Sequence, residues 1–546
     1  MLSQFSGACL RLLAAFGATA MLLVWAAMAA APQQSPSNSV TKRVGGSTFT
    51  LQLPERGIRI GAANELVLTI VPASQPSIPT TIASVSVLLS MPAMPGMTMS
   101  QPTVAAGSSG EYHVSVGFPH AGAYELSIVV KLQDGGPLRA SFPLNLAASD
   151  TNTAPGMMMS YVAGVSEMQQ ASGTSWQPAL TPMYGAHKMV GKWMVMTHYN
   201  VSVNYDQQTG PRGDYQYNST NWFMMMGDRS VGRDDLQLRT MLSLEPLTVT
   251  PRGYPLLFQS GEQYDGKPIV DRQHPHDLFM ELASRYTHPI ASDSAIFAYA
   301  APSGEPALGP TAFMHRLSAF DMPMAPITHH WMDSTHIDFG VLTVGAWKRS
   351  VQVESSYFTG REPGQNRYEI GPIHMDSYSG RLSYNPSSNW STQVSYGYLH
   401  SPEALTPGQD IRRTTASASY VLPERQGGWW AVTVGIGNNS IENTNSTAAL
   451  IETELNIAQR NSVFARYEYV NKLGEELAIA PAEQGFGIGE LTLGYVREIT
   501  PNRPFQTGIG AAVTLYTHPS SLSALYGSSP MGFWLFVRIR PAPMRM

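Results

Sequence analysis

The chain has 546 residues, more than one ordinary domain needs, and its net charge of −5 offers no basic field for nucleic acid as a partner. Only 13% of the residues are charged, about half of the roughly 25% that is usual in soluble domains. There is a single cysteine, Cys9, which excludes intramolecular disulfides and sites built from several thiolates.

The first residues have the pattern of a secretory signal peptide. Arg11 is followed by an apolar run from Leu12 to Ala31, and Ala27-Met28-Ala29 matches a small-residue cleavage site. We therefore expect a signal peptide at residues 1–29 and a polar linker at 30–42. The alternative is a retained anchor helix, because the run approaches the roughly 20 residues that span a bilayer.

A β-rich segment follows, and we expect it to form an immunoglobulin-like β-sandwich over residues 43–147. Short apolar runs alternate with Pro, Gly and Ser clusters at the spacing of sandwich strands. The expected strands are 48–53, 65–71, 82–89, 111–118, 123–132 and 138–146.

Three elements of this segment resemble the YtkA-like domains. They are Met91-Pro-Ala-Met-Pro-Gly-Met-Thr-Met99, Gly110-Glu-Tyr112 and Ala121-Gly-Ala-Tyr-Glu-Leu126. The resemblance covers about residues 45–147, with Tyr124 where the family often has Trp. It implies a small exported immunoglobulin-like sandwich of a kind often associated with copper handling.

Methionine thioethers are soft, uncharged ligands that favour Cu(I), so this segment is a candidate copper site. Its expected ligands are Met91, Met94, Met97, Met99, His113 and His120. The alternative is that these methionines pack a core or a loop, because methionine adapts to irregular gaps.

After a second linker at residues 148–160, we expect an outer-membrane antiparallel β-barrel over residues 161–546, with lipid as its surroundings. Strands such as Gln393–Tyr398 and Trp430–Gly437 alternate apolar with small or polar residues, as strands between lipid and a wet lumen do. A sheet in lipid must close, because an open edge leaves backbone groups unsatisfied. The pattern predicts an all-β protein with about 12 to 16 barrel strands.

The first part of the barrel region is rich in methionine and histidine. Met194, Met196 and His198 share one face if they lie in one strand. We expect that face to point inward or to lie at a rim, where His198 could contact a metal ion. Met224–Met226 follow shortly after. The alternative is that the face is directed to lipid, where methionine is merely apolar.

The densest polar motif is Asp271-Arg-Gln-His-Pro-His-Asp277. His274 and His276 flank a proline that favours extended backbone, and with Asp277 they suit Zn(II), Cu(II) or Fe(II). Further histidines follow at 288, 315, 329, 330 and 336. The alternative is a hydrogen-bonded turn or plug in which Arg272 pairs with Asp277.

Residues 173–340 also resemble a group of uncharacterised bacterial envelope barrel proteins, through Gly173–Trp176, Gln208–Gly213, Ser243–Pro246, Gly253–Leu257 and Asp271–Asp277. That resemblance implies no reaction.

The leading functional hypothesis is an outer-membrane barrel with a periplasmic domain that takes part in copper or other soft-metal homeostasis. Copper would be its cofactor, and metal ions or periplasmic metal-handling proteins its partners. The alternatives are an outer-membrane hydrolase with a His/carboxylate site and a structural barrel without metal. No G-x-S-x-G element supports the hydrolase.

Overall fold

The computed structural model describes residues 39–54, 58, 63–71, 82–91, 101–107, 110–118, 122–133, 136–146, 161–424, 427–442, 444–501 and 503–544. The expected signal peptide and the second linker lie outside these ranges. The chain divides into two compact units, so the N-terminal strands and the barrel are described separately.

The N-terminal strands form two sheets. One has the order β1-β2-β3-β6-β5 and the other the order β4-β7-β8. The bounds are β1 Ser39–Val44, β2 Ser47–Gln52, β3 Ala63–Val71, β4 Ile82–Ser90, β5 Thr103–Ala106, β6 Glu111–Gly117, β7 Gly122–Leu132 and β8 Leu138–Leu146. All six expected strands are present, and the all-β prediction is confirmed.

Several of these strands, among them β2, β3 and β6, bury alternate side chains, as a sandwich strand does. In β3 the buried residues are Asn64, Leu66, Leu68 and Ile70. The two sheets adjoin where Lys42 of β1 lies 5.7 Å from the ring centroid of Phe142 in β8.

The expected linker at residues 30–42 is wrong at its end, because β1 begins at Ser39 and pairs with β2 from Ser39↔Gln52 to Val44↔Ser47. None of the β1 side chains is fully buried. The strand therefore has no alternation of apolar and polar residues that a sequence pattern could reveal.

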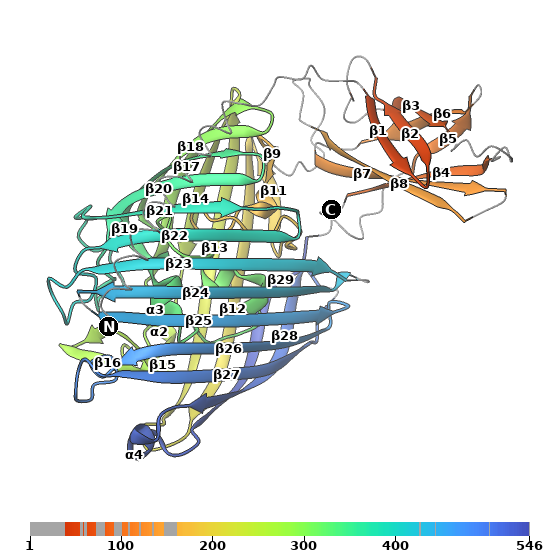
Figure 1. The fold of residues 1–546 in the computed structure, drawn as a ribbon. Coiled ribbons are helices and arrows are strands. Elements are labelled where there is room, and N and C mark those ends of the chain that lie inside the picture. The colour runs from red at the N-terminus through yellow and green to blue at the C-terminus, as the bar shows by residue number, and fades with distance from the viewer. Residues whose placement is uncertain are drawn as a thin grey trace, which may run out of the picture. The chain divides into compact units, whose positions relative to one another are not determined.

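The second part is a closed antiparallel barrel of 16 strands, at the upper end of the predicted range (Figure 1). It closes through pairing of β12 with β29, from Val201↔Ile539 to Gln208↔Gly532. The strands are β12 Trp193–Gln208, β13 Tyr215–Val231, β14 Asp234–Leu242, β17 Phe279–Ala291, β18 Ser294–Gly304, β19 Asp338–Lys348, β20 Val351–Thr359, β21 Ser377–Tyr384, β22 Trp390–Leu399, β23 Ile411–Pro423, β24 Trp429–Ile441, β25 Thr444–Ile457, β26 Asn461–Leu473, β27 Gly485–Glu498, β28 Phe505–Thr517 and β29 Met531–Pro541.

Short strands and helices accompany the barrel. β11 (Ala186–Val190) pairs with β12, and β15 (Tyr254–Tyr264) pairs with β16 (Lys267–Gln273) as a separate hairpin. Among the described residues, no helix is both long enough and apolar enough to cross a membrane.

The two faces of the barrel wall differ as the alternation predicts. In β29 the side chains of Leu535 and Val537 are exposed on the outside, while Arg538 and Arg540 are buried inside. Val434 and Ile436 of β24 are likewise exposed. A closed barrel with an apolar outer face and a polar lumen is of the outer-membrane type, and this location is as predicted.

The two ends of the barrel differ in the length of their connections. At one end the turns are short, such as residues 232–233 and 292–293, and at the other end the loops include residues 243–278, 305–337 and 360–376. Short turns face the periplasm in barrels of this type. The chain enters β12 and leaves β29 at the short-turn end of the barrel.

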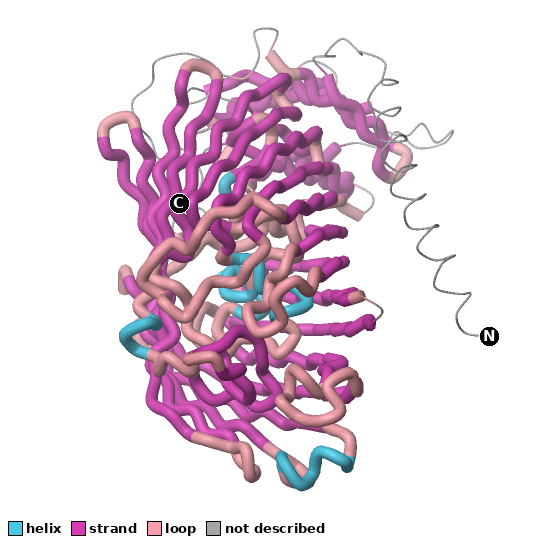
Figure 2. The backbone as a smooth tube through the Cα atoms, turned by 90° about the vertical axis from the view of Figure 1, so that its left-hand side faces the viewer, coloured by secondary structure: helices cyan, strands magenta, loops and turns pink. Residues whose placement is uncertain are grey.

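The connection from β18 to β19 folds into the barrel, and we call residues 305–337 the lumen segment. It contains η2 (Phe313–His315), η3 (Leu317–Ala319), α3 (His329–Met332) and η4 (Ser334–His336), and nearly all of its residues are buried. Figure 2 shows these helical turns in cyan, surrounded by strands.

Arginines fix the lumen segment to the wall. Arg316 lies 2.5 Å from Asp333 and 2.6 Å from Glu452 of β25, while Arg538 of β29 lies 2.9 Å from Asp321. These pairs neutralise charges that burial would otherwise make costly.

Candidate functional site

A cavity of about 720 Å³, including its part open to solvent, lies inside the barrel beside the lumen segment. Its lining is unusually rich in soft and aromatic side chains. We call this site the lumen pocket, and its characteristic residues are Met183, His198, Trp222, Met224, Met226, Met314 and His315.

Two neighbouring strands supply most of these side chains. β12 and β13 pair so that His198 lies opposite Met224 and Met196 lies opposite Met226. Met196, Met224 and Met226 are buried, whereas Met225 between the last two is 52% exposed on the outer face. The expectation that the Met194–Met196–His198 face points inward agrees with this burial.

Within the lumen pocket, Nε2 of His198 lies 3.3 Å from Sδ of Met226. Two ligands of one tetrahedral ion, a nitrogen at about 2.0 Å and a sulfur at about 2.3 Å, are about 3.5 Å apart. The ring of Trp222 is 4.9 Å from that of His315 and 6.2 Å from that of His198. The two imidazoles thus share one aromatic neighbour.

His315 is suited to act as a neutral ligand. Burial in the lumen segment lowers the pKa of His315 to about 3. The imidazole is therefore neutral at pH 7, and its unprotonated nitrogen can donate a lone pair to a metal ion.

The lumen pocket continues into a larger methionine-rich core. Met196, Met224, Met226, Met241, Met280 and Met314 form one buried cluster with Trp222 and Phe313, and Met183 and Met544 pack against it. Sequence inspection had found the methionines of β12 and β13, but not Trp222 or Met314.

A second group of side chains is formed by five histidines, which we call the histidine cluster: His274, His276, His329, His330 and His336. All are buried. Ring centroids are 5.1 Å apart for His329 and His336, 5.3 Å for His276 and His336, and 5.4 Å for His329 and His330. His274 joins through His330 at 6.1 Å.

Four of these imidazoles have a carboxylate beside Nδ1. The distances from Nδ1 are 3.3 Å to Glu262 for His274, 2.9 Å to Glu245 for His276, 2.8 Å to Asp333 for His329 and 3.1 Å to Glu362 for His330. Hydrogen bonds at Nδ1 fix the rings of His329 and His330, whereas Nδ1 of His276 has no hydrogen-bond partner among the described residues. Burial also lowers the pKa of His330 to about 4, so this ring is neutral.

The structure therefore joins His274 and His276, as the motif suggested, to histidines more than 50 residues away in sequence. The proposed pairing of Arg272 with Asp277 is wrong. Arg272 lies 2.6 Å from Asp214, and Asp277 lies 3.2 Å from Arg367. The motif turns inward after the end of β16, so the side chains of Arg272 and Asp277 reach different partners.

The N-terminal candidates are only partly described. Met91 continues the buried face of β4 after Val87 and Leu89, and it is itself buried. His113 in β6 is exposed. Met94, Met97, Met99 and His120 lie outside the described residues, so a shared site in this domain stays a prediction.

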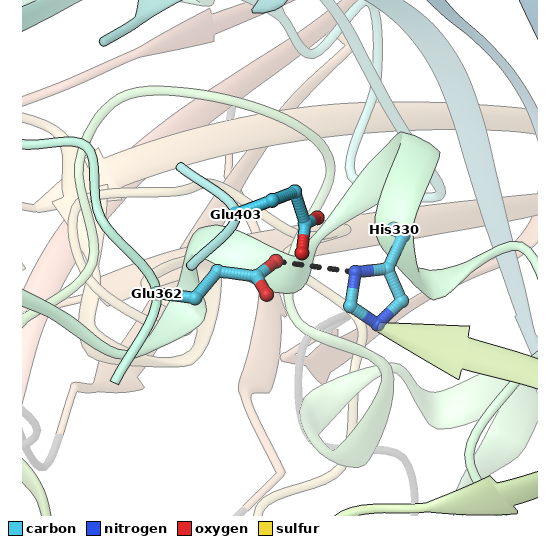
Figure 3. A group of neighbouring side chains, drawn as sticks. All are labelled: His330, Glu362 and Glu403. Carbon is cyan, nitrogen blue, oxygen red and sulfur yellow. Dashed lines mark hydrogen bonds and ion pairs between the residues drawn. The ribbon is translucent and has the colours of Figure 1, made fainter. Parts of the chain in front are cut away.

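One group of possible metal ligands escaped sequence inspection. His330, Glu362 and Glu403 place one nitrogen and two carboxylate oxygens within 4.8 Å of one another (Figure 3). Glu362 and Glu403 are isolated loop residues, and no spacing in the sequence connects them to His330.

The YtkA-like family model matches residues 41–129. No curated protein matches the chain.

Several solved outer-membrane proteins are similar. An anion-selective porin from Comamonas acidovorans is 11% identical, with a TM-score of 0.41 over 64% of this chain and 99% of that one. OmpF of Salmonella typhi, in complex with daunomycin, is 9% identical with a TM-score of 0.41, over 65% and 100% of the chains. The channel DcaP of Acinetobacter baumannii is 9% identical with a TM-score of 0.38, over 66% and 100%. The chain thus combines a segment that the YtkA-like family model matches with a closed 16-stranded barrel.

Proposed function

We propose that this outer-membrane barrel binds a soft metal ion, Cu(I), in the lumen pocket, as part of copper homeostasis. The observation that carries the proposal is the 3.3 Å approach of His198 Nε2 to Met226 Sδ within a methionine-rich cavity. Thioether and neutral imidazole ligands select Cu(I) over hard ions such as Mg²⁺ or Ca²⁺.

The surroundings of the lumen pocket support a monovalent cation. Trp222 presents an aromatic ring to both imidazoles, and an aromatic face attracts a cation. Arg239 also lines the cavity, but it is held by Glu281 at 3.3 Å, which offsets its charge. A singly charged ion therefore meets less repulsion there than a divalent one would.

The YtkA-like domain supplies a second part of the proposal. Met91, Met94, Met97 and Met99, with His113 and His120, would form a separate Cu(I) site on the periplasmic side. Because Met91 is buried, that site depends mainly on the other residues of the set.

The test is a titration of the detergent-solubilised full-length protein with Ag(I), a stable stand-in for Cu(I). Met224→Leu with Met226→Leu removes two thioethers and nearly conserves volume. We expect it to lose one equivalent of bound ion, or to weaken that site at least about tenfold, as loss of a metal-site group commonly does.

The matched control is Met225→Leu, which alters the residue between these two on the outer face and should bind as the parent does. Replacing Met91, Met94, Met97 and Met99 with Leu should remove a different equivalent. If the folded Met224/Met226 variant binds silver like the parent, the lumen methionines are packing and the proposal fails.

A further inference from the structure

Three loops converge on one point near the long-loop end of the barrel. His330 comes from α3 of the lumen segment, Glu362 from the connection between β20 and β21, and Glu403 from the connection between β22 and β23. Figure 3 shows the Glu362 carboxylate directed at Nδ1 of His330, 3.1 Å away, with the Glu403 carboxylate beside it.

These two carboxylates have no close cationic partner, although the guanidinium of Arg413 acts on both of them from a longer distance. Among the described residues, no lysine or arginine nitrogen lies within 4.0 Å of Glu362 or Glu403, whereas Asp333 and Glu452 are both paired with Arg316. Two partly buried carboxylates that share only this distant counter-charge are costly to keep ionised side by side.

An unpaired oxygen marks the same place. Oε2 of Glu362 is buried and has no hydrogen-bond partner among the described residues. A bound cation would both neutralise the two carboxylates and satisfy this oxygen.

His330 is held so that its Nδ1 remains directed at the carboxylates. Its ring lies against Gly261, where the Cβ of any other residue would overlap the imidazole. Its backbone carbonyl accepts a hydrogen bond of 2.9 Å from Asn439 Nδ2. The imidazole of His330 is therefore held by close packing against Gly261, and its backbone is held by a hydrogen bond from the barrel wall.

One imidazole nitrogen and two carboxylate oxygens make a donor set for a borderline divalent ion. Zn²⁺ binds such ligands at about 2.0–2.2 Å. The three ligand atoms already lie within 4.8 Å of one another, so they need to move together only slightly to reach one ion. The set contains too few oxygens for Ca²⁺ and no sulfur for Cu(I).

We propose that His330, Glu362 and Glu403 bind a divalent transition-metal ion, Zn²⁺ or Cu²⁺, at the long-loop end of the lumen. The three ligands leave one position open for water or an incoming group. The bound ion links two outer loops to the lumen segment. This site does not depend on Cu(I) binding in the lumen pocket.

The first test measures Zn²⁺ binding to the full-length protein in detergent. Glu362→Gln and Glu403→Gln keep the side-chain shape but remove the charge, and each should weaken binding at least about tenfold. The control is Glu483→Gln, an exposed residue in the loop between β26 and β27 at the same end of the barrel, which should bind as the parent does.

The second test needs no variant. Electron paramagnetic resonance of the parent with one equivalent of Cu²⁺ should show coupling to a single nitrogen, because the site contains one imidazole. Coupling to two or more nitrogens would show that other imidazoles of the histidine cluster bind the ion, and it would overturn the proposal. Parent-like Zn²⁺ affinity in both folded glutamine variants would overturn it as well. If neither variant folds, the Cu²⁺ spectrum of the parent decides.

Discussion

Arg316 holds the lumen segment through two buried carboxylates, Asp333 and Glu452. Replacement by methionine leaves both acids buried without a counter-charge, which should lower the free energy of unfolding by about 3–5 kcal/mol. Denaturant unfolding in detergent, followed by tryptophan fluorescence, measures the loss.

The matched control is Arg349→Met. Arg349 pairs with Asp293 at 3.1 Å, but its side chain is 77% exposed, and such pairs contribute only about 0–1 kcal/mol. Equal losses for Arg316→Met and Arg349→Met would show that the buried pairs do not fix the lumen segment.

Candidate ligands could be predicted only where one strand or one short motif carries them. Met196 and His198 share a face because β12 alternates sides, and this followed from the sequence. Trp222, Met314 and Glu403 could not be found, because their approach depends on barrel closure and on the path of loops. His274 and His276 were found through their local motif, but their partners His329, His330 and His336 needed the fold.

The barrel strands were predictable because lipid on one side and a polar lumen on the other impose a period of two. β24 and β29 show the alternation directly, with apolar residues outside and, beside a few aromatic rings such as Trp534 and Phe536, polar or small residues inside. The lumen segment is surrounded on all sides and therefore has no such period. Its place inside the barrel could not be predicted from the sequence.

The lumen segment should block free passage through the barrel. Gly304 and Asp338 are paired neighbours in β18 and β19, so a short Gly/Ser turn can replace residues 306–336. The wall residues Glu452 and Arg538 would then be solvated, and the barrel should still close. We expect a several-fold rise in single-channel conductance in planar lipid bilayers.

Heat-modifiable mobility on gels checks that this shortened protein still forms a barrel. A folded shortened barrel with the conductance of the parent would mean that the lumen segment does not occlude the lumen.

In the whole molecule, the YtkA-like match ends at residue 129, while β7 continues to Leu132 and pairs with β8. A piece covering residues 36–148 should therefore fold as a soluble β domain. A piece covering 36–130 should not, because it lacks the edge strand that covers β7. Circular dichroism and thermal unfolding compare the two, and equal stability would show that β8 is not part of the domain.

Copper K-edge X-ray absorption of the full-length protein loaded with Cu(I) tests the lumen pocket most directly. The measurement uses the variant in which Met91, Met94, Met97 and Met99 are leucine, so that sulfur from the N-terminal domain does not contribute. We expect both sulfur and nitrogen neighbours around copper, and loss of the sulfur neighbours after Met224→Leu with Met226→Leu. A copper ion without sulfur neighbours, or an unchanged spectrum in the Met224/Met226 variant, would contradict a soft-metal site in the lumen pocket.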